Sequence, residues 1–128
     1  MVTADYATSQ HLNLYYCGVE AYPLRKEVIR QTGYEAYIEP ALWESFLSNY
    51  EKALLGDEKV NAQATLSIAH QKILEFESTK RFHVVYLDAF AAIYLPDMWT
   101  DEVFSYVANL LVTGGIFVTY AITGILKR

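Results

Sequence analysis

The stretch Phe82–Arg128 constrains the fold of this chain more than any other part of the sequence. It reads FHVVYLDAFAAIYLPDMWTDEVFSYVANLLVTGGIFVTYAITGILKR. An apolar strand ends in Asp88 and is followed by a loop, an amphipathic helix, a Gly-Gly turn and a second apolar strand. This order predicts one strand–helix–strand step of an open parallel sheet, in which ligands bind outside the carboxyl ends of the strands. Asp88 therefore stands where such a fold places its binding site.

The composition predicts a packed single domain over residues 1–128. The chain is 53% hydrophobic and 20% charged, which excludes a disordered polymer. The net charge of −5 gives no overall attraction to nucleic acid, so any RNA contact needs a local basic patch such as Lys127-Arg128. Cys17 is the only cysteine, which excludes an intramolecular disulfide and suits a reducing cytoplasm.

The sequence also lacks the signals of membrane insertion and metal binding. Its first ten residues, MVTADYATSQ, have no basic-then-apolar pattern, and no apolar run reaches the length of a membrane span. His11, His70 and His83 make no metal-ligand spacing with one another or with Cys17. We therefore expect a cytoplasmic protein without a membrane segment or a metal site.

Hydrophobic periodicity predicts alternating strands and helices. The predicted strands are Leu12–Val19, Ala62–Ile68, Phe82–Leu87 and Ile116–Tyr120. The predicted helices are Val2–Gln10, Pro23–Thr32, Pro40 to about Leu54, and Asp101–Leu111, with a short helical piece at Ile73–Phe76. Thr100 is expected to cap the helix that starts at Asp101, because its hydroxyl can accept a free backbone N–H. The predicted fold class is α/β, with three layers and a mostly parallel sheet.

Three pieces of the sequence resemble a known family. GVEAYPL, LDAFAAIYLPDMWTDEVF and GGIFVTYAITGILKR are similar to segments of the MnmC/MnmD-type tRNA methyltransferases, which have the class I S-adenosylmethionine-dependent methyltransferase fold. The combination of Pro-x-Met-Trp-Thr with Gly-Gly-x-x-x-Thr-Tyr is specific, whereas an acidic residue after a strand is a weak signal by itself. The similarity covers Leu14–Leu24 and Phe82–Arg128, and covers Gln31–Glu77 only by the order of elements.

The resemblance implies a Rossmann-like sheet, S-adenosylmethionine as cofactor, and methylation of the aminomethyl group of a modified wobble uridine in tRNA. It implies that Glu20 binds the ribose hydroxyls of the cofactor, a role that suits an acceptor-only carboxylate at a strand end. Asp88 would be the catalytic residue and a cofactor ligand, because a carboxylate there can pair with a cationic group or orient the incoming amine. His70 would contact the cofactor near its adenine.

The resemblance also implies residues that contact the substrate. Pro96 and Trp99 would shape the loop over the site, and Trp99 would also pack under the helix that follows. Lys127 and Arg128 match a pair of basic residues in the family, which can meet phosphate groups of the tRNA.

Departures from the family pattern change what we expect of this chain. The family has a G-x-G-x-N-like loop after its first strand, and no such segment stands before Leu12; its closing strands after the last basic pair are not in the sequence either. Ala92 stands where the family has proline, and Asp97 where it has glutamate. We therefore expect a partial methyltransferase-like domain with an incomplete sheet, weak binding of S-adenosylmethionine, and no methyl transfer by this chain.

An alternative function stays open at this point. A catalytically inactive methyltransferase-like α/β module could act as an oligomerising or partner-binding domain, because a sheet without a central strand exposes edges that another chain can cover. The apolar faces of Val84–Leu87 and Ile116–Val118 predict a homo-oligomer. A third interpretation, an unrelated nucleotide-binding or flavodoxin-like protein, is opposed by the two specific motifs of the resemblance.

Overall fold

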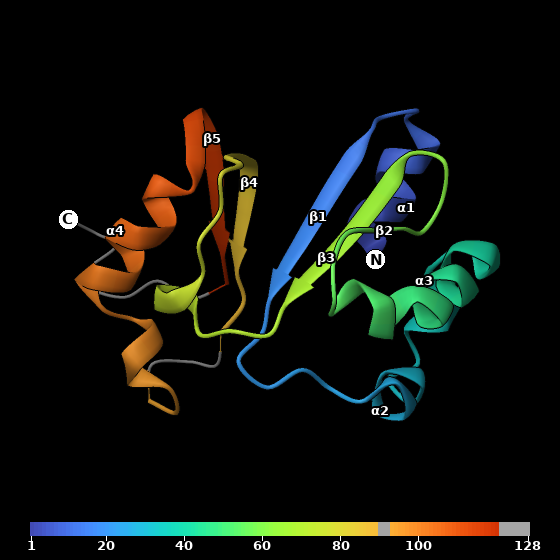
Figure 1. The fold of residues 1–128 in the computed structure, drawn as a ribbon, viewed down its shortest axis with the longest axis horizontal. Helices are drawn as coiled ribbons and strands as arrows, with labels where there is room; N and C mark the ends of the chain where they lie inside the picture. The colour runs from blue at the N-terminus through green and yellow to red at the C-terminus, as the bar shows by residue number, and fades with distance from the viewer. Residues whose placement is uncertain (90–92, 121–128) are drawn as a thin grey trace. The chain divides into compact units, whose positions relative to one another are not determined.

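The computed structural model describes residues 1–89 and 93–120 of the chain, which divides into two compact units, Met1–Ile73 and Leu74–Arg128. Each unit combines helices with a small sheet (Figure 1). The predicted α/β class is therefore confirmed at this level.

The first unit contains a sheet in the order β1-β3-β2. Strands β1 (Leu14–Val19) and β3 (Ala64–Ala69) pair in parallel over their whole length. Their bounds agree with the predicted strands to within two residues at each end. The two-residue strand β2 (Glu58–Lys59) pairs antiparallel with β3 and was not predicted. The turn between β2 and β3 is closed by Asn61, whose Oδ1 accepts hydrogen bonds from the backbone N–H groups of residues 63 and 64 at 2.9 and 2.7 Å.

Helices α1 (Val2–Ser9) and α3 (Pro40–Ala53) contact β3 (Figure 1). Alternate residues of β3 are buried, so one face of the sheet packs against these helices. The buried side chains that form this core are Ala4, Ile38, Leu42, Trp43, Leu47, Tyr50, Ala53, Val60, Ala64, Leu66 and Ile68. The core of the first unit is therefore a two-layer contact between a sheet face and two helices.

Local sequence signals place the start of α3. Pro40 occupies the first turn, where its missing N–H has no partner to lose, as predicted. Glu39 caps the helix, because its carboxylate accepts hydrogen bonds from the backbone N–H groups of Ala41 and Leu42 at 3.1 and 2.8 Å. A carboxylate also suits the positive end of the helix dipole.

Helix α2 (Lys26–Arg30) is shorter than the predicted helix Pro23–Thr32. Its N-cap Arg25 has extended backbone angles, so the residues after Pro23 do not begin a helix. The carbonyl of Leu24 instead accepts a hydrogen bond of 2.6 Å from the hydroxyl of Tyr50 on α3. A tertiary contact thus replaces the first turn that the sequence pattern predicts.

The second unit contains the parallel pair β4 (Phe82–Leu87) and β5 (Leu111–Thr119), joined by α4 (Asp101–Asn109). The bounds of β4 are those predicted. The predicted cap of α4 is confirmed, because Thr100 Oγ1 accepts a hydrogen bond from Val103 N at 3.2 Å. Among the described residues of this unit, the buried hydrophobic side chains are Phe76, Leu87, Trp99, Val103, Val107 and Leu110.

The Gly-Gly pair lies inside a strand and not in the turn that the sequence predicts before Ile116. The backbone N–H of Phe82 bonds to the carbonyl of Leu110 at 2.8 Å, so β5 already begins at Leu111. The register then shifts from Phe82↔Leu111 to Val84↔Ile116, which leaves extra residues on β5. Such a bulge needs unusual backbone angles, and Gly114 supplies a positive φ of 78°.

Among the described residues, no strand of the first unit pairs with a strand of the second, so each unit has its own small sheet. The sequence predicts that these strands belong to one mostly parallel sheet in a three-layer fold. The observed pairs β1–β3 and β4–β5 are parallel as expected. The departures are the antiparallel β2 and the division of the described strands between two sheets.

We expect Gly115→Ala to lower the free energy of unfolding by about 1–3 kcal/mol, because a Cβ would overpack the bulge. That atom would lie 2.9 Å from the carbonyl oxygen of Val112 and 3.3 Å from that of His83. Gly56→Ala is the matched control, since its Cβ would meet nothing within 4 Å. Urea unfolding followed by circular dichroism measures both, and equal stabilities of the two variants would contradict the role of Gly115.

Candidate functional site

Two of the predicted site residues leave the first sheet at the same edge. The parallel register of β1 and β3 ends at Val19↔Ala69, and the backbone N–H of Glu20 bonds to the carbonyl of Ala69 at 2.9 Å. Glu20 and His70, the next residues of the two strands, therefore stand side by side at the carboxyl edge. Both side chains are exposed.

Asp88 follows β4 in the second unit. The pairing of β4 with β5 ends at Leu87↔Thr119, so Asp88 also stands at a carboxyl edge, and its side chain is exposed. The next residue is held in place, because the hydroxyl of Tyr120 bonds to the carbonyl of Ala89 at 2.5 Å. A cleft shared by Asp88 and Glu20 stays a prediction.

A cavity of about 460 Å³ lies beside Glu20 in the first unit. It is bounded by the face of β1 and β3 that packs toward the helices and by residues of α2 and α3. Its lining residues are Met1, Val2, Thr3, Tyr16, Gly18, Glu20, Leu24, Ile29, Thr32, Tyr34, Ile38, Trp43, Phe46, Tyr50, Leu66 and Ile68. The volume lies within the range of small-molecule binding sites.

Five of the sixteen described residues that line this cavity are aromatic. Along α3 the ring centroids of Trp43 and Phe46 are 5.7 Å apart, and those of Phe46 and Tyr50 are 5.8 Å apart with a T-shaped geometry. Among the described lining residues, Glu20 has the one charged side chain, and Met1 contributes the α-amino group of the chain. The cavity therefore combines aromatic walls with a carboxylate at the strand end.

Gly18 leaves space in the cavity wall. Residues alternate between the two faces of a strand, so Tyr16, Gly18 and Glu20 share the face of β1 that borders the cavity. A Cβ at Gly18 would meet no atom within 4 Å. The missing side chain thus keeps the floor of the cavity open between Tyr16 and Glu20.

The charge of Glu20 affects the pKa of Tyr50, another residue that lines the cavity. Burial raises the pKa of the Tyr50 phenol above its ordinary value, and the Glu20 carboxylate raises it further. Its hydroxyl donates to the carbonyl of Leu24, which fixes the ring against the loop after β1. Tyr50, Trp43 and Gly18 were not predicted as site residues. On α3 the sequence shows only an apolar helical stripe, which core residues produce equally well.

The remaining predicted residues lie elsewhere. Pro96 begins a short 3₁₀ helix (Pro96–Met98) and is exposed. Trp99 is only 4% exposed and packs edge to face against Phe104 and Tyr120, with centroid distances of 6.1 and 6.2 Å. Its predicted packing under α4 is therefore observed. Lys127 and Arg128 lie outside the described residues.

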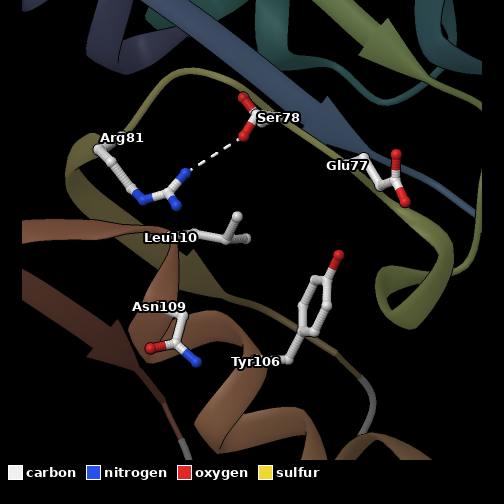
Figure 2. Close-up of a pocket in the computed structure, with 6 residues that line it drawn as sticks. All are labelled: Glu77, Ser78, Arg81, Tyr106, Asn109 and Leu110. Atoms are coloured by element: carbon white, nitrogen blue, oxygen red, sulfur yellow. Dashed lines mark hydrogen bonds between the residues drawn. The ribbon is translucent and has the colours of Figure 1, made fainter.

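A second, smaller hollow of about 220 Å³ lies in the second unit (Figure 2). It stands at the start of β4 and the end of α4, at the opposite end of β4 from Asp88, and is lined by Glu77, Ser78, Arg81, Tyr106, Asn109 and Leu110. The Arg81 guanidinium is turned toward Ser78, and its Nη1 donates to the carbonyls of Ser78 and Lys80 at 3.1 and 3.3 Å. This cation closes the turn before β4.

Residues 1–89 and 93–120 hold no cluster of histidine, cysteine and acidic side chains suited to a metal ion. None of its helices has the length and apolar character that crossing a membrane requires.

Comparison with known proteins identifies the family. Residues 34–128 match the S-adenosyl-L-methionine-dependent methyltransferase family, and the chain belongs to it. The resemblance seen in the sequence motifs is thereby confirmed. No solved structure gives a significant match.

Curated relatives are bifunctional proteins named for tRNA 5-methylaminomethyl-2-thiouridine biosynthesis, MnmC. The protein of Campylobacter fetus is 32% identical over 71% of this chain and 16% of its own length. Those of Acinetobacter baylyi and Pseudomonas putida are 27% and 29% identical over 92% and 97% of this chain, each over 20% of its own length. The chain thus spans a fifth or less of the relatives it matches.

We expect Tyr50→Phe to lower the free energy of unfolding at neutral pH by about 1 kcal/mol, through loss of the hydrogen bond to Leu24. Because the pKa of Tyr50 is raised, there is a pH range in which the folded chain keeps the phenolic proton and the unfolded chain has lost it. This proton contributes its full stabilisation at pH values below the ordinary tyrosine pKa of 10.0. The stabilisation is lost as the pH rises through the higher pKa that Tyr50 has in the folded chain. The variant should therefore lose less stability than the wild type above pH 10.0.

Urea unfolding at a series of pH values measures this difference. Tyr37→Phe is the matched control at neutral pH, because Tyr37 is 76% exposed and its hydroxyl removal should leave stability unchanged. Parallel curves of stability against pH for Tyr50→Phe and the wild type would contradict the assignment.

Proposed function

We propose that this chain carries the carboxylates of an S-adenosylmethionine-dependent methyltransferase that acts on the aminomethyl group of a modified wobble uridine in tRNA. Membership of the methyltransferase family, together with Glu20 at a strand end beside an aromatic cavity, supports this proposal most strongly. The substrate is proposed from the names of the MnmC relatives.

The residues around the cavity fit the cofactor chemically. The Glu20 carboxylate is acceptor-only and can accept hydrogen bonds from two ribose hydroxyls. The aromatic walls and the open floor at Gly18 suit a flat group of the size of a nucleobase. His70, which leaves the sheet next to Glu20, is proposed as a further contact to the cofactor.

Asp88 is proposed as the catalytic residue. When bound, S-adenosylmethionine supplies a methyl group on a sulfonium sulfur. The carboxylate of Asp88 would accept a hydrogen bond from the substrate amine and hold its lone pair toward that methyl group. Its exposed position at the end of β4 leaves it accessible, and the Tyr120–Ala89 hydrogen bond limits movement of the backbone beside it.

The tRNA would be met by residues outside the cavity. Pro96 is exposed at the start of its 3₁₀ helix and is proposed to contact the substrate. Trp99 is proposed to support the same loop from inside, where its ring is packed. Lys127 and Arg128 are proposed as phosphate contacts, because cationic side chains position a nucleic acid through its backbone.

We expect S-adenosylmethionine to bind this chain weakly, because its sequence contains no glycine-rich loop to offer backbone donors. Glu20→Gln should weaken the binding further, by about tenfold or more, through loss of charge-assisted hydrogen bonds. Isothermal titration calorimetry measures both affinities. Glu51→Gln is the matched control, since Glu51 is exposed on α3 and does not line the cavity.

The outcomes separate the parts of the proposal. Equal affinity of Glu20→Gln and the wild type would remove Glu20 from the site. Absence of binding at millimolar cofactor would instead favour a module without catalytic activity. Methyl transfer to tRNA carrying the aminomethyl uridine that is abolished by Asp88→Asn would show that the site is more complete than the sequence of this chain predicts.

A second candidate function is an oligomerising module. One face of the β4–β5 pair is apolar and exposed: Val84 and Tyr86 on β4 are 40% and 52% exposed, and their partners Ile116 and Val118 are 59% and 39% exposed. Parallel strands are normally covered on both faces. We propose that a second copy of the chain covers this face.

We expect light scattering at micromolar concentration to report a dimer or larger species. Ile116→Lys should shift the mass toward the monomer, because a charge in the contact opposes burial of the face. Leu55→Lys is the matched control, since Leu55 is 91% exposed in the first unit. A monomer mass for the wild type would exclude this candidate function.

A further inference from the structure

Tyr120 is an exposed aromatic side chain whose ring is held at two points. It directly follows β5 and is 60% exposed. Its hydroxyl donates a hydrogen bond of 2.5 Å to the carbonyl of Ala89. Its ring packs edge to face against Trp99, with a centroid distance of 6.2 Å and an interplanar angle of 88°. A ring fixed in this way has already lost the rotational freedom that a ligand contact would otherwise remove.

The ring stands beside the carboxylate at the end of β4. The pairing of the two strands ends at Leu87↔Thr119, so Asp88 and Tyr120 leave the sheet as neighbours at its carboxyl edge. The hydroxyl of Tyr120 bonds to Ala89, whose Cα is about 3.8 Å from that of Asp88. The side chain of Asp88 is exposed, and no ion pair involves it among the described residues. A fixed aromatic ring and an accessible carboxylate are therefore adjacent.

The segment that leaves β4 adds apolar surface to this edge. Tyr120 contacts the segment twice, at Ala89 and again at Trp99. Between these two contacts, residues 93–95 read Ile-Tyr-Leu and are 84%, 79% and 38% exposed. Contiguous exposed apolar side chains are typical of a surface that meets a ligand or a partner.

We propose that Tyr120 is a substrate-binding residue, whose ring stacks on a pyrimidine base extruded from a single-stranded loop of RNA. An amine substituent of that base is directed to Asp88. The choice of this base rests on the proposed function above, whereas the stacking role of Tyr120 rests on the fixed, exposed ring beside the carboxylate.

The chemistry of this edge favours such a base over other ligands. Every base has a flat π-face, and proteins hold unpaired bases mainly by stacking them on aromatic side chains. An amine on the base can donate a hydrogen bond to Asp88, and its protonated form is also attracted by the face of the Tyr120 ring. A phosphate group would be repelled by the carboxylate. A hydrocarbon would use the ring and leave Asp88 without a role.

The experiment compares two short single-stranded RNAs that differ at one central position, which is 5-aminomethyluridine in the first and an abasic site in the second. Fluorescence anisotropy of the labelled RNAs measures their affinities for the whole chain. We expect loss of the base to weaken binding to the wild type by about tenfold, the effect of one stacked base.

Variants of Tyr120 then separate the ring from its hydroxyl. In Tyr120→Leu the difference between the two RNAs should disappear, because leucine has no π-face. Tyr120→Phe keeps the ring and should retain most of the difference, although it loses the hydrogen bond to Ala89. Tyr37→Leu is the matched control, since Tyr37 is 76% exposed in the first unit and its loss should leave the difference unchanged.

A measurement on the wild type covers the case in which a Tyr120 variant does not fold. An RNA with 5-iodouridine at the central position crosslinks on irradiation to an aromatic side chain in contact with that base, and mass spectrometry identifies the residue. We expect the crosslink at Tyr120, and we expect the aminomethyluridine RNA to compete for it better than the abasic RNA does. A crosslink at another residue, equal affinities of the two RNAs for the wild type, or a difference that persists in Tyr120→Leu would overturn the role of Tyr120.

These outcomes are distinct from those that test the proposed function. A Tyr120-dependent base contact without any binding of S-adenosylmethionine would support this inference and contradict the proposed cofactor. Binding of S-adenosylmethionine without a Tyr120-dependent base contact would support the proposed cofactor and contradict this inference. Absence of binding of either RNA would also contradict this inference, and the cofactor titration would still decide the proposed cofactor.

Discussion

The parallel pairing of β1 with β3 is the interaction on which the first unit depends. It connects two segments that are about fifty residues apart, Leu14–Val19 and Ala64–Ala69, in an unbroken register. That register places the alternate buried residues of β3 on one face, where α1 and α3 cover them. It also brings Glu20 and His70 to the same edge. A slip of one residue would turn the buried side chains to the other face and separate the edge residues from the cavity.

The cavity exists because the packing of this unit is incomplete at one place. Protein interiors are normally filled to the density of organic crystals, so a hollow lined by large side chains requires a cause. Gly18 provides one, since it contributes no side chain to the face of β1. Tyr50 provides another, because its hydrogen bond to Leu24 holds the ring in place and limits collapse. Trp43 lines the same cavity, and its indole N–H is buried without a hydrogen bond.

The sequence predicted the elements whose signals are local. Pro40 and Thr100 marked the starts of α3 and α4, since proline and a capping hydroxyl act within one turn. The elements it predicted poorly depend on distant partners. The carbonyl of Leu24 bonds to the hydroxyl of Tyr50 and not within the predicted first turn after Pro23, so α2 begins later than predicted. Strand β2 pairs with β3, and β5 begins early because Phe82 of β4 pairs with Leu111. The motifs of the methyltransferase family were recognisable in the sequence because their residues are contiguous. The helix-start signals at Pro40 and Thr100 are local in the same way.

The sequence by itself determined the α/β class, the parallel direction of most strands and the family, because apolar periodicity and contiguous motifs are readable without a structure. It also placed Glu20, His70 and Asp88 at strand ends, since a strand boundary is a local property. Only the tertiary structure decided that Glu20 borders a cavity with aromatic side chains and that its charge helps to raise the pKa of Tyr50. An apolar stripe on α3 looks the same in sequence whether its side chains fill a core or surround a hollow. The difference depends on residues far away in the chain, and here one residue that lines the cavity is a glycine on β1.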